Sequence, residues 1–244
     1  MEKSAELELT PFLEGSLIVY QPKKGFRFGI DSILLANFLK LKPQKLNLEI
    51  GAGSGIISLI GLKKFPEARI FALEIEPIFI KCLKKNAFEN KVQDRLFIIR
   101  GDMNSILFKP GIFDVIFSNP PYFKKESGRL SPYEIENIAR KNLKFDLDSF
   151  LHKVSFYLKN KGNFYLIFTA LRLAELIYLL KKHNLEPKIL RLVYSYPHSE
   201  AKLVLILAKK NAKEEIRIFP PLYIYSSYKG EYSEEVKKML KRLE

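Results

Sequence analysis

The stretch LNLEIGAGSGIISL, residues 46–59, decides the fold class. The apolar run 46–50 passes directly into Gly51-Ala-Gly-Ser-Gly55, and apolar residues at helical spacing follow. Glycines let the backbone turn tightly at such a point, and they let it approach a ligand with which side chains would clash. A strand, a glycine-rich turn and a helix in this order predict the first unit of an α/β sheet with a ligand site at the turn.

Short apolar runs recur after this turn and alternate with longer amphipathic segments. This alternation predicts an α/β fold in which a mostly parallel sheet carries helices on both faces. A short loop, instead of a helix, joins the last two runs, which predicts an antiparallel final strand. We expect seven strands, at residues 46–50, 68–75, 96–100, 113–119, 163–169, 188–196 and 201–208.

Amphipathic segments fill the gaps between these strands. We expect an additional N-terminal helix over 31–39, capped by Asp31 or Ser32, and an exposed C-terminal helix from Ser233. Residues 1–45 are interpreted as a lead-in with a capping helix, and residues 46–244 as the main part of one compact domain. The other helices are expected at residues 54–64, 77–90, 147–160 and 171–184.

Composition narrows the class of protein. Of 244 residues, 47% are apolar, and 41 basic against 27 acidic side chains give a net charge of +14, which favours a nucleic-acid partner. No apolar run approaches the roughly 20 residues of a membrane helix, and the N-terminus does not resemble a secretory signal. We therefore expect a cytoplasmic protein with no membrane partner. A single cysteine, Cys82, and three histidines without ligand-like spacing argue against a bound metal.

An acidic residue, Glu74, ends the strand that follows the glycine turn. An acid at about this distance can accept hydrogen bonds from both hydroxyls of a ribose. The spacing Gly51-x-Gly53-x-Gly55 differs from the Gly-x-Gly-x-x-Gly pattern that places pyrophosphate at a helix N-terminus. The pattern therefore favours a nucleoside cofactor without phosphates. The alternative interpretation is a plain strand-to-helix turn.

A second motif, Asn119-Pro120-Pro121-Tyr122, follows the apolar run FDVIFS and precedes Phe123. Two prolines remove two amide donors and stiffen the loop, so the Asn119 side chain and the Pro120 carbonyl can act as fixed acceptors. By accepting both hydrogens of an amine on a planar ring, they favour its pyramidal, nucleophilic form. Tyr122 offers a ring face on which a flipped base can stack. We interpret Asn119, Pro120 and Tyr122 as catalytic, with Tyr122 and Phe123 touching the substrate.

Taken together, the motifs resemble those of class I S-adenosylmethionine-dependent methyltransferases, in the branch that modifies amines. The order and spacing of four segments match that group: LEIGAGSGIISL (48–59), FALEIEP (71–77), IIRGDMN (98–104) and IFSNPPYF (116–123). Three further segments are similar to the family of tRNA1(Val) adenine-37 N6-methyltransferases: QPKKGFRFGIDSILLANFL (21–39), IAR (138–140) and PLYIYSSYKGEYSEEV (221–236).

This resemblance covers roughly residues 20–244 and implies a Rossmann-like class I fold with S-adenosylmethionine as the cofactor. It implies methylation of the N6 amine of an adenine in RNA, with tRNA near the anticodon as the partner. Glu74 would bind the ribose, Ile75 would pack on the adenine, and Asp102 would accept the adenine amine. The cofactor-binding set that the resemblance implies is Asp31, Glu49, Gly51, Gly53, Glu74, Ile75, Asp102, Met103 and Asn119.

Basic residues flank the expected mouth of the site, where they favour contacts to RNA phosphates. Their alternative interpretation is a solvated surface, just as Asp31 has an alternative role as a helix cap. The basic substrate-binding residues predicted here are Lys23, Lys24, Arg27, Lys124, Lys125, Arg129 and Arg140.

Other functions stay open at this point. The same loop suits methylation of a glutamine amide in a release factor, or of the guanine N2 amine in ribosomal RNA, because each presents a planar NH2 group. A non-catalytic RNA-binding module on a methyltransferase fold is a further alternative. Both a monomer and a homodimer are compatible with the sequence.

Overall fold

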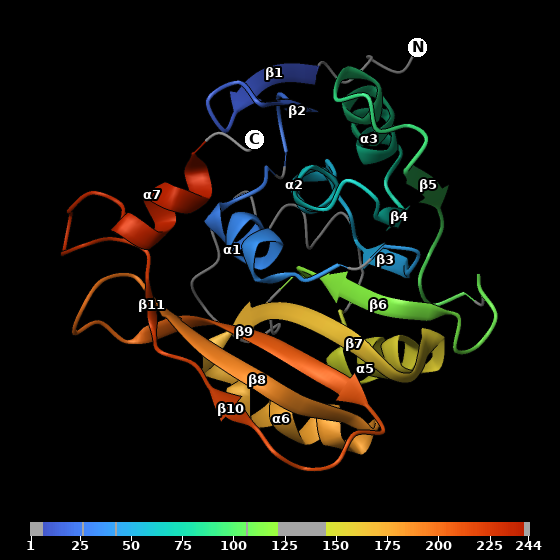
Figure 1. The fold of residues 1–244 in the computed structure, drawn as a ribbon, viewed down its shortest axis with the longest axis vertical. Coiled ribbons are helices and arrows are strands. Elements are labelled where there is room, and N and C mark those ends of the chain that lie inside the picture. Colours follow the sequence, from blue (N-terminus) through green and yellow to red (C-terminus); the bar gives the residue numbers. More distant parts are fainter. Residues whose placement is uncertain (1–6, 26, 42, 106, 122–144, 242–244) are drawn as a thin grey trace.

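A nine-stranded sheet forms the centre of the molecule (Figure 1). The computed structural model describes residues 7–25, 27–41, 43–105, 107–121 and 145–241. Seven strands follow the order β5-β4-β3-β6-β7-β9-β8, and β10 and β11 add two residues each beside β8. The bounds are β3 Leu46–Ile50, β4 Arg69–Glu74, β5 Leu96–Arg100, β6 Phe113–Ser118, β7 Leu158–Thr169, β8 Leu185–Tyr194, β9 Ala201–Lys210, β10 Arg217–Ile218 and β11 Leu222–Tyr223.

The strand directions confirm the predicted α/β class. β5, β4, β3, β6 and β7 pair in parallel, and β9 lies antiparallel between β7 and β8. The predicted antiparallel final strand of a seven-stranded sheet is therefore confirmed. The two-residue strands β10 and β11 were not expected, because such short runs carry no periodic signal.

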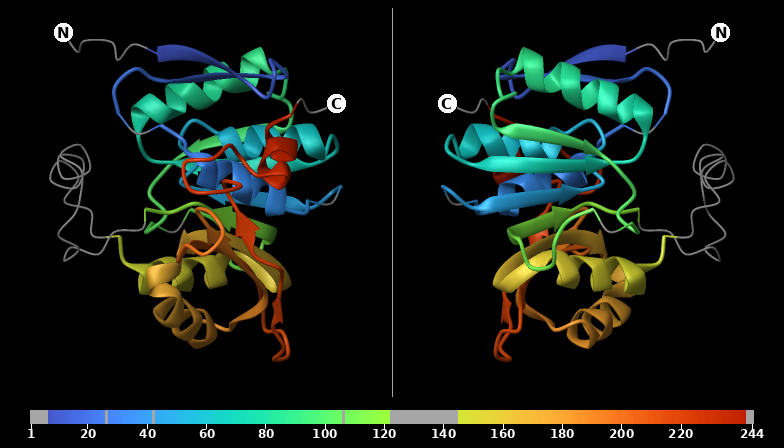
Figure 2. Two further views of the ribbon diagram at one scale, coloured as in Figure 1. Left: turned by 90° about the vertical axis from the view of Figure 1, so that its left-hand side faces the viewer. Right: turned by 90° about the vertical axis from the view of Figure 1, so that its right-hand side faces the viewer.

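Helices cover both faces of the sheet (Figure 2). Residues of α1, α2, α3 and α7 join one apolar cluster, and residues of α5 and α6 join a second. Alternation along β6 divides its side chains between them: Val115 and Phe117 face the first cluster, and Ile116 faces the second. The helices are α1 Ile30–Phe38, α2 Ile56–Lys64, α3 Pro77–Glu89, α5 Leu147–Tyr157, α6 Leu173–Lys182 and α7 Glu234–Leu240.

Several element ends differ from the prediction. α5 ends at Tyr157 instead of residue 160, and β7 begins at Leu158 instead of residue 163. α2 begins at Ile56 because Gly55, at a φ of 85°, is its left-handed N-cap. A short 3-10 turn, Ala170–Arg172, precedes α6.

The predicted cap of the first helix is wrong. α1 begins at Ile30 with Gly29 as its N-cap, so Asp31 and Ser32 lie inside the first turn. The Asp31 carboxylate accepts a hydrogen bond from the Ser32 amide at 2.8 Å. An acidic side chain in the first turn is favourable there because of the positive end of the helix dipole.

An N-terminal hairpin, β1 Leu7–Phe12 and β2 Leu17–Pro22, was not predicted. Two side-chain amides, one in α3 and one at its C-cap, bind the free edge of β2 as a neighbouring strand would. Asn86 Oδ1 accepts from the Tyr20 amide at 2.6 Å, and Asn86 Nδ2 donates to the Tyr20 carbonyl at 3.0 Å. Asn90 binds Ile18 in the same way, at 3.0 and 2.6 Å. Apolar residues on both sides of position 46 belong to the same core cluster. The division of the chain into a lead-in and a main part at this position stays a prediction.

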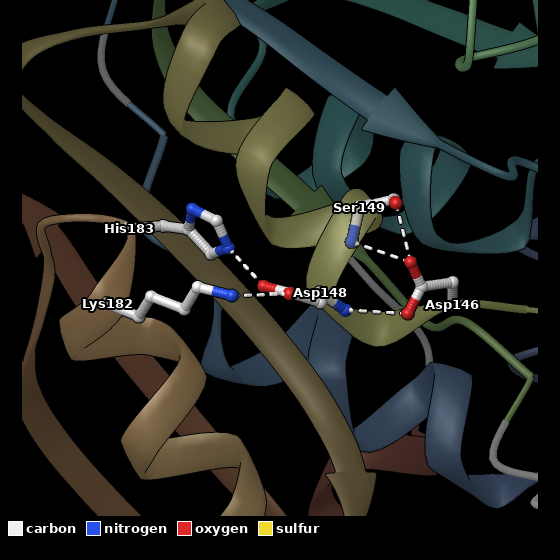
Figure 3. A network of polar contacts seen from close by, with 5 residues as sticks. All are labelled: Asp146, Asp148, Ser149, Lys182 and His183. Atoms are coloured by element: carbon white, nitrogen blue, oxygen red, sulfur yellow. Dashed lines mark hydrogen bonds and ion pairs between the residues drawn. The ribbon is translucent and has the colours of Figure 1, made fainter.

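Polar contacts connect the start of α5 with the end of α6 (Figure 3). Asp146 is the N-cap of α5, and its carboxylate accepts from the amides of Asp148 and Ser149 at 3.2 and 3.1 Å. Asp148 in turn binds Lys182 and His183, each at 2.5 Å. Hydrogen bonds from Lys182 and His183 hold the pKa of Asp148 below its usual value.

The described part of the chain contains no helix long and apolar enough to cross a bilayer. Within the same residues, no group of three or more His, Cys, Asp or Glu side chains could hold a metal ion.

Candidate active site

The glycine turn between β3 and α2 is open on one side. Gly51 and Gly53 have φ values of 72° and 55°, and a Cβ added to either would meet no atom within 4 Å. Gly55 differs, because a Cβ there would lie 2.5 Å from a Leu83 methyl group of α3. The first two glycines therefore leave room for a ligand, whereas the third allows a helix to pack closely.

Glu74, at the end of β4, holds this turn in place. One carboxylate oxygen, Oε2, accepts from the Gly53 amide at 2.8 Å. The other, Oε1, accepts from the amides of Ile75 and Glu76 at 2.8 and 2.9 Å. The Glu74 side chain is almost fully buried, so these bonds fix its orientation at the carboxyl end of the sheet.

Glu49, two residues before Gly51, is buried beneath the same turn. Its exposed fraction is 1%, and Ser58 of α2 donates to its carboxylate from both the backbone amide and the hydroxyl. Burial raises the pKa of Glu49 to about 8, with a further contribution from the charge of Glu74 and an opposing one from Ser58. At neutral pH this carboxyl is therefore mostly protonated, and a cation placed beside it would favour the ionised form.

Asn119 comes directly after β6 and lies beside the glycine turn. β3 and β6 are in register at Ile50 and Ser118, and the Ser118 hydroxyl donates to the Ile50 carbonyl at 2.7 Å. Asn119 Nδ2 donates to the Ser32 hydroxyl of α1 at 3.0 Å. The N-terminal helix thus orients the amide that follows β6.

One pocket joins these elements at the carboxyl end of the parallel strands. Four of the predicted site residues line it, namely Glu49, Gly51, Gly53 and Asn119. Ligands in open α/β sheets bind at this end of the strands. Its other lining residues are Phe28, Ser32, Ala52, Ser54, Ile56, Ile57 and Phe79.

Sequence motifs missed the aromatic and N-terminal walls of this pocket. Phe28 and Ser32 come from the lead-in, and Phe79 comes from the start of α3. None of these residues belongs to a motif that indicates a particular chemistry, because phenylalanine rings and single serine hydroxyls occur throughout most sequences. For Phe28 and Ser32 the one available signal is their position within the segment 21–39, which resembles the N-terminal motif of the methyltransferase family.

The remaining predicted cofactor residues do not line this pocket. The Gly101 amide donates to the Glu74 carbonyl at 3.0 Å, which brings Asp102 next to the end of β4. The Asp102 carboxylate accepts from Asn104 instead, at 2.9 and 3.0 Å. Ile75 is 40% exposed, Met103 is half-buried, and Asp31 lies one residue before Ser32.

The predicted RNA-contacting side chains are only partly described. Lys23 and Lys24 are exposed, whereas Arg27 binds Glu8 at 2.9 Å and Thr10 at 3.1 Å on the hairpin. Pro120 is buried and Pro121 is exposed. Tyr122, Phe123, Lys124, Lys125, Arg129 and Arg140 lie outside the described residues, so the roles predicted for them stay predictions.

One family of known proteins matches more than half of the chain. The sequence profile of the family described as "Methyltransferase small domain" matches residues 27–171. The chain belongs to this methyltransferase family. The resemblance inferred from the sequence motifs is thereby confirmed.

Curated relatives of this methyltransferase carry a more specific name. The tRNA1(Val) (adenine(37)-N6)-methyltransferase of Porphyromonas gingivalis is 32% identical over 187 residues, which cover 73% of this chain and 72% of its own. The protein of the same name from Dyadobacter fermentans is 25% identical over 229 residues, which cover 91% and 92% of the two chains.

Solved structures show the same fold at low sequence identity. A predicted O-methyltransferase from Agrobacterium tumefaciens superimposes with a TM-score of 0.69 at 16% identity, over 86% of this methyltransferase and 94% of that chain. Geranyl diphosphate methyltransferase in complex with S-adenosylmethionine gives 0.56 at 12% identity, over 74% and 84%. These likenesses support the class I methyltransferase fold.

Proposed function

We propose that this methyltransferase transfers a methyl group from S-adenosylmethionine to the exocyclic N6 amine of an adenine in tRNA, beside the anticodon. The observation that carries the proposal is the position of Asn119, which lines the same pocket as Gly51 and Gly53. Its sequence context, Asn-Pro-Pro-Tyr, provides acceptors for an amine on a planar ring. The printed names of the curated relatives support the same reaction.

The residues around the glycine turn fit S-adenosylmethionine. Open space in front of Gly51 and Gly53 admits a ligand close to the backbone, and Glu49 is a buried acid that a positive charge would favour as a carboxylate. Glu74 and Asp102 lie at the ends of neighbouring strands, where their oxygens can accept from the ribose hydroxyls and the adenine amine. When bound, the cofactor supplies a methyl group made electrophilic by its sulfonium.

The chain's own residues then have to hold and orient the amine. Asn119 and the Pro120 carbonyl accept its two hydrogens, so the nitrogen lone pair is directed to the methyl carbon. In this arrangement the amine nitrogen would take up the methyl group and would release one proton to water. Tyr122 holds the flipped base by stacking. Alignment is the main requirement, and no strong general base is needed.

The charge of the chain fits a tRNA substrate. A net charge of +14 attracts a polyanion such as tRNA. Binding of a protein substrate such as a release factor does not require this excess of basic residues. We propose the cytoplasm as the place of action, because that is where we expect the enzyme to meet tRNA.

The test is incubation of the purified protein with labelled S-adenosylmethionine and unmodified tRNA, followed by mass spectrometry of the nucleosides. We expect N6-methyladenosine in the tRNA. Incubation with a release factor and with ribosomal RNA serves as the comparison. Label at a glutamine or at a guanine N2 amine, with none in the tRNA, would replace this function by one of the alternatives.

The Asn119→Ala variant tests the mechanism. We expect it to bind S-adenosylmethionine with an affinity close to that of the wild type, and to lose most of its turnover, because the amine loses one acceptor in the transition state. Calorimetry measures the binding, and single-turnover kinetics measures the methyl transfer. Normal turnover in this variant would refute the assigned role of Asn119.

A further inference from the structure

Tyrosine rings gather between the end of β8 and the start of α7. Their ring contacts have centroid distances of 5.6, 5.3 and 5.2 Å, and the last pair is stacked with an interplanar angle of 9°. Isolated exposed aromatic residues are ordinary, whereas a group of them marks a binding surface. The tyrosine cluster consists of Tyr194 with Tyr223, Tyr196 with Tyr228, and Tyr225 with Tyr232.

Three members of the cluster keep a large part of their rings in water. Tyr228 is 66% exposed, and Tyr225 and Tyr232 are 37% and 38% exposed. The Tyr228 and Tyr196 rings pack in a T-shaped arrangement, and the ammonium group of Lys229 lies over the Tyr228 ring at 5.4 Å from its centroid. The cluster therefore presents aromatic surface beside a positive charge.

Backbone bonds make the turn that carries Tyr228 rigid. The Ser226 amide donates to the Glu231 carbonyl at 2.8 Å, and Tyr225 and Tyr232 form an antiparallel bridge. Gly230 allows the tight closure, because a Cβ there would lie 2.4 Å from the Ser227 hydroxyl. A preformed aromatic surface loses little conformational entropy when it binds a ligand.

The cluster lies at the same edge of the sheet as the candidate active site. β8 is antiparallel to β9, β9 is antiparallel to β7, and β7 is parallel to β6, so β8 and β6 end at the same edge. Figure 1 shows the turn before α7 on the side to which the arrow of β6 points. From β6 to β8 and β11 the sheet takes three to four strand steps, about 15 to 20 Å. A few nucleotides of RNA cover such a distance.

The cation next to the Tyr228 ring favours an anionic ligand at this position. Lys237 pairs with Glu231 at 2.9 Å and with Glu234 at 3.2 Å, so its single positive charge is shared between two acids. Among the described residues, no carboxylate lies within ion-pair distance of Lys229. A cation next to an exposed aromatic face suits a phosphate followed by a base.

We propose that the tyrosine cluster binds unpaired nucleotides of the RNA substrate near the target adenine, with one base stacked on Tyr228 and a phosphate beside Lys229. This inference rests on the proposed function and adds a binding site outside the catalytic pocket. Single-stranded RNA is recognised through such aromatic platforms, because unstacked bases expose their faces. The cluster selects for RNA with unpaired nucleotides at the correct distance from the target base.

The test compares two exposed tyrosines. Tyr228→Ala removes the stacking face, and Tyr178→Ala on α6 is the matched control, because Tyr178 is 67% exposed and lies outside the cluster. We expect the dissociation constant and the KM for unmodified tRNA to rise about tenfold in Tyr228→Ala. Tyr178→Ala and Tyr228→Trp should stay close to the wild type, and all variants should bind S-adenosylmethionine normally.

The outcomes separate this inference from the proposed function. If Tyr228→Ala binds tRNA as tightly as Tyr178→Ala does while N6-methyladenosine still forms, the cluster is not an RNA site and the proposed reaction stands. If tRNA binding depends on Tyr228 but no methylated adenosine forms, the RNA site stands and the reaction falls. Equal melting temperatures for the variants show that the fold is intact.

Discussion

At the scale of single residues, Glu49 shows how one buried carboxyl produces a pH dependence. Its pKa is raised by burial to about 8 in the folded chain, above the ordinary value of 4.5 for a glutamate. The folded state therefore holds a proton that the unfolded state loses, and the stability from that proton is lost as the pH rises from about 4.5 to about 8. The expected loss is on the order of 4 kcal/mol.

Glu49→Gln should remove this dependence, because glutamine stays neutral. We expect the free energy of unfolding of the wild type to fall relative to that of the variant as the pH rises from 5 to 8. Urea unfolding of both proteins at several pH values measures the difference. A difference that does not change with pH would contradict the burial of a protonated Glu49.

The candidate site could be predicted where its chemistry is local. Gly51, Gly53 and Asn119 stand in motifs whose spacing indicates their neighbours, and the structure brings these three to one pocket. Phe28 and Phe79 could not be predicted, because they reach the pocket from distant segments and an apolar ring has no sequence signature. The hydrogen bond from the Gly53 amide to the Glu74 carboxylate could not be predicted either, since it depends on the register of β3 and β4.

At the scale of elements, Asn86 connects the N-terminal hairpin with the glycine turn. Its Nδ2 atom donates to the Ser54 carbonyl at 2.8 Å as well as to Tyr20, and its side chain is fully buried. Asn86→Ala would leave buried backbone groups without partners. We expect it to reduce the free energy of unfolding by about 3 kcal/mol, measured by urea unfolding.

Asn90→Ala is the matched control for this prediction. Asn90 lies one turn further along the helix region and binds Ile18, but it is only half-buried and does not reach the glycine turn. Water can replace more of its bonds, so the expected loss is smaller, about 1 kcal/mol. Equal losses in both variants would show that contact with Ser54 adds nothing.

Regular elements were predictable because burial imposes a period on them. β3 and β5 match their predicted bounds. β3 ends directly before Gly51, and β5 is a short apolar run that ends at Arg100, directly before Gly101. The hairpin was missed because its edge pairs with asparagines 66 to 72 residues away, as at Tyr20 and Asn86 or Ile18 and Asn90. The start of β7 was missed because Lys159 and Lys161 interrupt its apolar pattern.

At the scale of the whole molecule, the net charge of +14 predicts salt-dependent binding of tRNA. Lys24 is exposed, whereas Arg27 is paired with Glu8. We expect Lys24→Gln to lower the slope of log affinity against log salt concentration by about 1, and Arg27→Gln to lower it less. Filter binding at several salt concentrations gives both slopes. The reverse order would show that Arg27 exchanges Glu8 for a phosphate.

The position of β9 between β7 and β8 has a consequence for synthesis of the chain. β8 is synthesised before β9, although β9 lies between β7 and β8 in the sheet. The edge of β8 that binds β9 therefore stays unpaired until residues 201–210 have emerged from the ribosome. A nascent chain stopped at residue 200 would expose two strand edges to other chains. The emergence of residues 201–210 therefore sets the moment at which the edges of β7 and β8 are covered.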